Sequence, residues 1–75
     1  MQLVITDHAH ERMCRRKIKK GWVKRAILNG RDVSMDQRRS GKQVKTNRGE
    51  LTVVFTKNKN EYTIVTVWID DGRFI

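Results

Sequence analysis

The sequence predicts an α+β fold in which two N-terminal helices pack on a three- or four-stranded antiparallel sheet. Two observations support this prediction. Residues 1–30 repeat apolar side chains at helical spacing, whereas residues 43–69 alternate apolar and polar side chains as strands do. The chain has 75 residues and contains no proline, internal repeat or low-complexity linker. We therefore expect a single domain over residues 1–75 with one small core.

Both helices have recognisable ends. Thr6 or Asp7 can cap the first helix by accepting from its free backbone N–H groups, and we expect that helix to end near Lys17. With Lys19 as the N-cap of the second helix, Ile18 and Val23 occupy the two positions of a hydrophobic staple, and Gly30 ends the helix. The apolar positions are Ala9, Met13, Trp22, Val23, Ala26 and Ile27. The two helices are expected to form a compact helix-turn-helix hairpin.

The rest of the chain predicts strands and turns. Val33 and Met35 suggest a short edge strand, residues 36–43 (DQRRSGKQ) an exposed turn, and residues 47–49 (NRG) a second turn, with Val44 in the strand between them. Residues 51–56 (LTVVFT) alternate as a half-buried strand, residues 57–60 (KNKN) connect a hairpin, and residues 61–69 (EYTIVTVWI) form a central strand.

Three aromatic residues near the C-terminus have more than one interpretation. We expect Tyr62 and Trp68 to share one face of the last strand, where they either pack in the core or offer a stacking platform for bases. A turn is predicted at Asp71–Gly72, after which Phe74 and Ile75 dock on the body of the protein or on a partner.

Positive charge is the strongest compositional signal. Lys and Arg number 17 against 8 Asp and Glu, which gives a formal net charge of +9. A domain this basic attracts polyanions, and RNA or another nucleic acid is the leading candidate. An acidic protein partner uses the same field, and solubility alone is a further explanation. A membrane surface is disfavoured, because the chain has no basic amphipathic helix with an aromatic apolar face.

The start of the chain and its single cysteine indicate a cytoplasmic protein. The segment MQLVITDH lacks the basic region and long apolar run of a secretory signal peptide. No apolar stretch approaches the ~20 residues that span a bilayer. One cysteine allows no internal disulfide, as is usual in a reducing compartment.

A histidine and three arginines fall on one face of the first helix. His8, Arg12, Arg15 and Arg16 are spaced at i, i+4, i+7 and i+8. An imidazole exchanges protons near neutral pH, and guanidinium groups bind phosphate oxygens, so these residue types can cleave RNA without a metal. The same spacing fits a phosphate-binding face without catalysis, or a histidine that only completes a cap. Arg15 can also pair with Glu11.

Metal binding is disfavoured. His10 and Cys14 are spaced at i, i+4 and could hold one ion together, but no second His/Cys pair completes a tetrahedral site. We expect no metal and no cofactor, and we interpret Cys14 as a small, partly buried apolar residue.

More basic residues lie in and near the predicted turns, where they can line a groove for an RNA backbone. Exposed loops and edge strands are also often charged merely to prevent edge-to-edge pairing. The candidate RNA-binding residues outside the first helix are Arg38, Arg39, Lys42, Lys45, Arg48 and Lys57.

The segment ITDHAHERMCRRKIKKGWVKRAILNG resembles the opening of the domain of unknown function 4258 family, and LTVVFTKNKNEYTIVTVWI resembles its final hairpin. The matching positions are His8, Ala9, Arg12, Arg15 or Arg16, Ile18, Val23, Ile27 and Gly30. That family is similar to the RelE and BrnT ribonuclease toxins. The resemblance implies a RelE/BrnT-like fold, a bacterial or phage origin, metal-independent cleavage of mRNA, and neutralisation by an antitoxin.

Two functions follow from the resemblance and the charge together. The first is a toxin-like endoribonuclease in which His8 and Arg12, the only residues that carry over by motif, are catalytic. The alternative is a non-catalytic nucleic-acid-binding or protein-interaction module that uses the same cationic surface. A helix-turn-helix DNA reader is disfavoured, because Val23, Ala26 and Ile27 of the second helix are committed to the core. A homodimer through the sheet edge is a further expectation.

Overall fold

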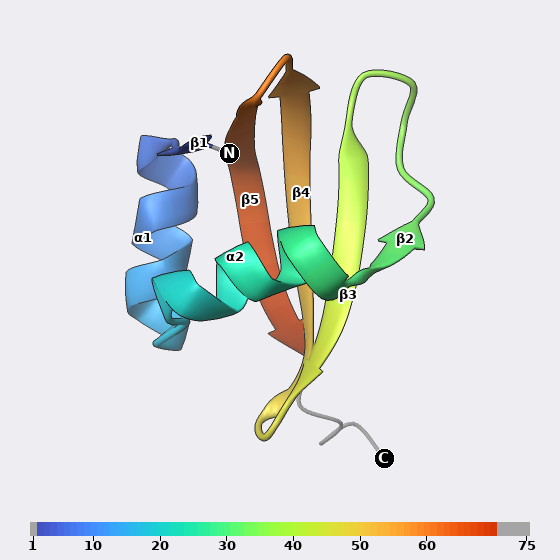
Figure 1. Cartoon of the computed structure of the whole chain (residues 1–75). Helices are drawn as coiled ribbons and strands as arrows, with labels where there is room; N and C mark the ends of the chain where they lie inside the picture. The colour runs from blue at the N-terminus through green and yellow to red at the C-terminus, as the bar shows by residue number, and fades with distance from the viewer. Residues whose placement is uncertain (1, 71–75) are drawn as a thin grey trace.

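A computed structural model of the chain describes residues 2–70 and contains two helices and one five-stranded sheet (Figure 1). The predicted turn at Asp71–Gly72 and the docking of Phe74 and Ile75 lie outside the described residues. The elements in chain order are β1 (Gln2–Ile5), α1 (Asp7–Arg16), α2 (Lys20–Asn29), β2 (Arg31–Val33), β3 (Ser40–Thr46), β4 (Gly49–Asn58) and β5 (Glu61–Asp70).

The sheet is mixed, with strand order β1-β5-β4-β3-β2. Strand β1 runs parallel to β5, with Gln2 opposite Glu61 and Ile5 opposite Ile64, and the other pairs are antiparallel. The predicted RelE/BrnT-like arrangement of helices on a three- or four-stranded antiparallel sheet is therefore wrong. The error comes mainly from β1, whose four residues are too few to show a period and whose partner lies at the other end of the chain.

Several strand boundaries also differ from the prediction. The predicted short edge strand exists as β2, but it ends at Val33 and does not reach Met35. Strand β3 begins at Ser40, inside the segment predicted as a turn. Strand β4 is buried throughout Leu51–Phe55 rather than on one face, because it is central in the sheet, and Thr52 accepts a hydrogen bond from Gln43 Nε2 at 2.9 Å. Strand β4 also runs on to Asn58, so the hairpin turn contains only Lys59 and Asn60.

Both helices cover the same face of the sheet (Figure 1). Helix α1 lies along β5, and α2 crosses β4 and β3, so each helix packs on the sheet more than on the other helix. The predicted compact hairpin of helices is therefore wrong, since the two axes cross at a large angle and approach at the connecting turn (Figure 1). The buried core consists of Ala9, Met13, Ile18, Val23, Ala26, Ile27, Leu51, Val53, Phe55, Ile64 and Val67.

A β-bulge at Val65 shifts the alternation of side chains along β5, so that residues before and after the bulge with the same parity point to opposite faces of the sheet. Val54 lies opposite Thr66 and Phe55 lies opposite Ile64, which leaves Val65 without a partner in the register. Tyr62 therefore packs against the core, with its ring 5.5 Å from that of Phe55, whereas Trp68 lies on the other face and is 42% exposed. The expectation that Tyr62 and Trp68 share a face is wrong.

The N-terminus of α1 is tied to this bulge by Thr6, as the predicted cap requires. Thr6 Oγ1 accepts from the backbone N–H of Ala9 at 3.2 Å and donates to the carbonyl oxygen of Ile64 at 2.9 Å. The same hydroxyl lies 3.3 Å from the carbonyl oxygen of Val65. One side chain thus caps the helix and fixes its first turn, which contains His8, against β5.

The capping prediction for α2 is also confirmed. Lys19 is the N-cap residue, its side chain makes no capping hydrogen bond, and Ile18 and Val23 are both buried at the staple positions. Gly30 closes the helix by donating its N–H to the carbonyl oxygen of Ala26 at 2.8 Å, in an extended conformation rather than a left-handed one.

The C-terminus of α1 is closed by Lys17 in the left-handed conformation, with φ 55° and ψ 46°. Ile18 donates its N–H to the carbonyl oxygen of Met13 at 2.8 Å, which gives a Schellman motif with an apolar contact between two core residues. A residue with a Cβ is disfavoured in this conformation, whereas glycine adopts it freely.

Lys17→Gly is therefore expected to raise the free energy of unfolding by about 0.5–1 kcal/mol. Chemical denaturation of the two proteins at the same salt concentration measures this difference. Lys17→Ala, which removes the same charge but keeps the Cβ, is the control, and equal stability of the two variants would contradict the assignment of backbone strain to Lys17.

Candidate nucleic-acid interface

His8 is exposed in the first turn of α1, as the nuclease hypothesis requires. Its side chain makes no hydrogen bond or ion pair with any other residue between 2 and 70. Its place is nevertheless fixed, because Thr6 anchors the first turn and Ala9 beside it is completely buried. The backbone of His8 is therefore fixed while its imidazole is open to solvent, where it can meet an external ligand.

The three arginines of α1 are also exposed, but they differ in their partners. Arg15 Nη2 lies 3.2 Å from Glu11 Oε1, an exposed pair of the kind that contributes little stability. Within the described chain, Arg12 and Arg16 make no ion pair. Arg12 follows His8 by one helical turn, so these two side chains emerge from the same flank of α1. They are free to bind an anion.

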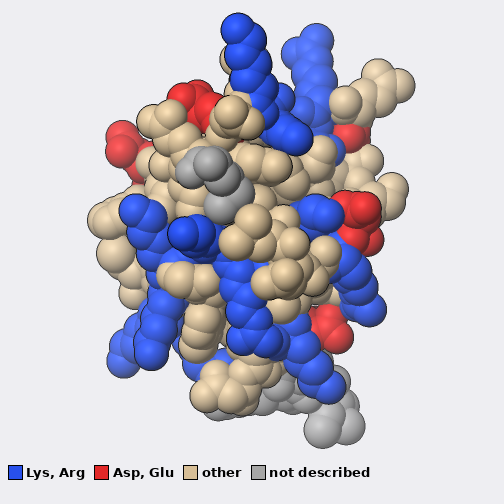
Figure 2. Space-filling model, viewed as in Figure 1, with Lys and Arg blue, Asp and Glu red and all other residues tan. Residues whose placement is uncertain are grey.

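Positive charge continues from α1 into α2. Residues 12–25 include eight Lys and Arg and no Asp or Glu. Figure 2 shows Lys and Arg side chains spread over the face that carries the helices, with Asp and Glu toward its edges. From Arg12 onward the helices thus carry charge of one sign, which attracts an extended polyanion better than scattered charges do.

Arg48 joins this charge from the turn between β3 and β4. Its Nη1 donates to the carbonyl oxygen of Lys17 at 2.9 Å, and its guanidinium carbon lies 5.9 Å from the centre of the Trp22 ring. Lys19 Nζ lies at the same distance from that ring. The fold thus places Lys19 and Arg48 against one half-buried indole, and Arg48 joins this pair to the backbone of Lys17.

The sequence prediction missed Lys17, Lys19 and Lys20 as part of this cluster. The basic run over residues 15–20, interrupted only by Ile18, is the signal that identifies it. The contribution of the β3–β4 turn is visible only in the folded structure. We name Arg12, Arg15, Arg16, Lys17, Lys19, Lys20 and Arg48 together the helix cationic surface.

The other predicted binding residues lie elsewhere. The Arg38 and Arg39 backbone N–H groups donate to Asp36 Oδ1, in the loop before β3. Ser40 is opposite Phe55, so this loop and Lys57 lie toward the end of the sheet that carries the β4–β5 turn. Arg48 lies at the other end, in the β3–β4 turn. Lys57 Nζ lies 5.4 Å from the Tyr62 ring centre.

Two further candidates are on β3 itself. Lys42 Nζ is 2.7 Å from Asp32 Oδ1 across the strand pair, so its charge is engaged, and Lys45 is exposed near the end of β3. The predicted residues therefore do not form one groove but lie in at least two separate regions.

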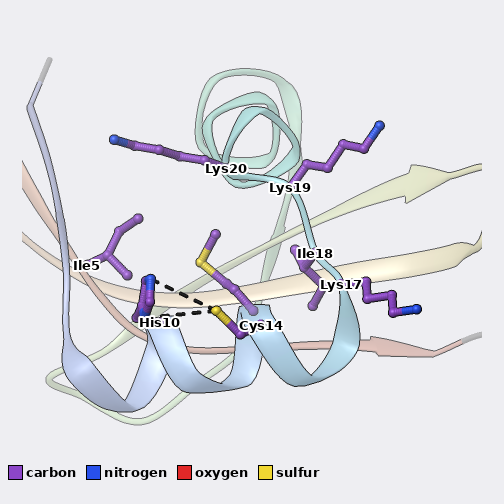
Figure 3. A pocket seen from close by; sticks show the side chains of 8 residues that line it. Ile5, His10, Cys14, Lys17, Ile18, Lys19 and Lys20 are labelled. Carbon is purple, nitrogen blue, oxygen red and sulfur yellow. Dashed lines mark hydrogen bonds between the residues drawn. The ribbon is translucent and has the colours of Figure 1, made fainter.

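A cavity of about 510 Å³ lies between the helices, on the flank of α1 opposite His8. His10 and Cys14 line it, and the Cys14 Sγ is 3.9 Å and 4.0 Å from the two ring nitrogens of His10 (Figure 3). Cys14 is exposed, so the expectation of partial burial is wrong. Within residues 2–70, no three metal-ligating side chains converge.

No helix among the described residues is long and apolar enough to cross a membrane. Neither the comparison with curated proteins nor the comparison with solved structures finds a match. A family model, the domain of unknown function DUF4258, matches residues 5–69. That match extends from the last residue of β1 almost to the end of β5 and includes His8, both helices and the β3–β4 turn. The chain therefore belongs to the DUF4258 family.

Proposed function

We propose that this protein binds RNA through the helix cationic surface. The observation that carries the proposal is the run of eight cations without an acid over residues 12–25, which Arg48 extends from a distant turn. Each phosphate contact releases a condensed counterion, so several such contacts give strong binding that weakens as the salt concentration rises.

Single-stranded RNA is the substrate class that fits best. Helix α2 buries Val23, Ala26 and Ile27 against the sheet and lies flat on it, so it is not presented as a DNA recognition helix (Figure 1). The surface offers charges and guanidinium groups, which bind phosphates, and few groups that read base edges. The choice of RNA over single-stranded DNA rests on the expected similarity of the DUF4258 family to ribonuclease toxins and not on the fold, whose mixed sheet differs from the RelE/BrnT-like arrangement.

Replacing both Arg12 and Arg16 with glutamine is expected to weaken RNA binding and its dependence on salt. Loss of two phosphate contacts lowers the slope of log affinity against log salt by about 1.4, that is, about 0.7 for each contact. Fluorescence anisotropy with a labelled single-stranded RNA at several salt concentrations measures this slope. The same measurement with single-stranded DNA of the same sequence tests whether the protein prefers RNA.

The matched control replaces Arg38 and Lys57 with glutamine. Both residues lie toward the end of the sheet that carries the β4–β5 turn, and the double substitution removes the same amount of charge. Its slope should stay close to that of the unmodified protein. If the two double variants lose affinity equally, the attraction depends on net charge and not on the helix cationic surface.

Cleavage of the bound RNA is a second proposed function, and one observation favours it. His8 is exposed, has no partner within the described chain and emerges beside Arg12, so an acid or base stands next to a phosphate-binding group. We propose that the protein is a toxin-like endoribonuclease that needs no metal. Incubation of purified protein and RNA with a chelator tests this proposal, and intact RNA would reject it.

A further inference from the structure

The apolar interior of the cavity between α1 and α2 is not used by either proposed function, although its lysines belong to the helix cationic surface. Three apolar side chains from different elements line it: Ile5 from β1, Met13 from α1 and Ile18 from the connecting turn. Figure 3 shows these elements around the opening, with His10 and Cys14 along α1. A volume of about 510 Å³ accommodates a large apolar side chain, and burial of such a side chain is favourable.

The same cavity has a cationic rim. Lys17, Lys19 and Lys20 complete its lining, and no acidic residue belongs to it. Figure 3 shows Lys20 extending from α2 on the side of Ile5 and His10, and Lys17 and Lys19 extending on the other side. The first turn of α2 also contains no acid, so its positive dipole end adds to the attraction for carboxylates.

We propose that this cavity binds an acidic segment of a partner protein, with one large apolar side chain inserted between the helices and carboxylates on the rim lysines. The charge complementarity extends beyond the cavity, because the rim continues into the helix cationic surface. An extended acidic chain engages all of these charges, whereas a small carboxylate reaches only the rim.

A nucleobase fits this cavity less well. Base edges carry hydrogen-bond donors and acceptors that lose water on burial. The apolar part of the lining, Ile5, Met13 and Ile18, offers them no side-chain partner, and the polar lining residues are His10 and the lysines of the rim. An aliphatic or aromatic side chain makes no such demand. The cavity and His8 lie on opposite flanks of α1. The two proposals share the rim lysines of the helix cationic surface but differ in the apolar contact, which RNA binding does not use.

Titration of the isotope-labelled protein with two acidic peptides tests the proposal. One peptide has a leucine at the centre of a run of glutamates, and the other has a serine there. The leucine peptide should shift the amide resonances of Ile5, Met13, Cys14 and Ile18 and bind about tenfold more tightly than the serine peptide, because only leucine gains from burial. Equal affinities would overturn the proposal, since charge alone would then explain binding.

Two pairs of variants locate the contact. Cys14→Phe fills the cavity from an exposed position and should remove the preference for leucine, whereas Cys14→Ser should keep it. Lys20→Glu, on the rim, should weaken peptide binding more than Lys24→Glu, one turn further along α2 and outside the lining. The lysine pair decides the matter if Cys14→Phe does not fold, and equal losses for the two lysine variants would contradict the proposal.

Two further ligands test whether the cavity binds a small molecule or a nucleobase instead of a peptide side chain. Octanoate that shifts the cavity resonances as strongly as the leucine peptide would make this a small-molecule site, and single-stranded RNA that loses affinity on Cys14→Phe would make it a base site. Either result would overturn the proposal. Failure of RNA to bind anywhere would reject the proposed function and leave this inference standing.

Discussion

Gly30→Ala is expected to lower the free energy of unfolding by about 1–3 kcal/mol. A Cβ at this position would lie 2.9 Å from the carbonyl oxygen of Gln43 and closer still to that of Ala26, and both neighbours are backbone atoms. The carbonyl of Ala26 accepts the hydrogen bond that ends α2, and Gln43 belongs to β3. The carbonyl of Ala26 cannot move without weakening the end of α2, and that of Gln43 cannot move without displacing β3 relative to the helix.

The size of this effect matters in so small a domain. A chain of 75 residues has a total stability of about 4–11 kcal/mol, at roughly 0.05–0.15 kcal/mol per residue. Urea denaturation followed by circular dichroism measures the loss. Gly21→Ala is the control, because a Cβ there meets nothing within 4 Å, and alanine favours the helix by up to about 1 kcal/mol. A stable Gly30→Ala protein would show that α2 can shift on β3 at little cost.

Gly30 also illustrates how a correct prediction can rest on the wrong cause. The sequence predicts it as the residue that ends α2, and it does end α2. Its φ of −72° is open to any residue, so conformational freedom is not the reason for glycine here. A Cβ here would meet the carbonyl oxygen of Ala26, within α2 itself, and that of Gln43 on β3; the first contact is local, whereas the second is a tertiary contact that no local pattern encodes.

The helix ends were predictable because their causes are local. Thr6 caps a helix that begins at the next residue, and Ile18 and Val23 form the staple positions around the following N-cap. The fifth strand and the bulge were not predictable for the opposite reason. Strand β1 is defined by a partner about 60 residues away, and Val65 is an extra residue only relative to the register of β4.

The candidate site divides in the same way. Helical spacing alone places His8 beside Arg12, and their exposure agrees with the prediction. The approach of Arg48 to Lys17 joins residues 31 positions apart, so it depends on the path of the sheet. Ile5 of β1 forms one wall of the cavity, so a sequence prediction that omits this strand cannot predict the cavity.

His8→Ala is expected to reduce metal-free RNA cleavage by about 10²–10⁴-fold, the usual contribution of a general acid or base. The side chain is exposed and has no partner within the described chain, so its removal should change the free energy of unfolding by less than about 0.5 kcal/mol. RNA affinity should also change little, because the phosphate contacts belong to the arginines and lysines. Cleavage rates with a chelator present, measured at saturating RNA, isolate the chemical step from binding.

His10→Ala is the matched control, since the chain contains only these two histidines and His10 lies on the cavity flank of α1. It should cleave at the rate of the unmodified protein. Cleavage that is metal-free must use the ribose 2′-hydroxyl as its nucleophile or a water activated by the protein, and an RNA with one 2′-deoxy residue at the cut site distinguishes the two. Full activity of His8→Ala would remove this imidazole from the reaction, and the helix cationic surface would then be a binding surface only.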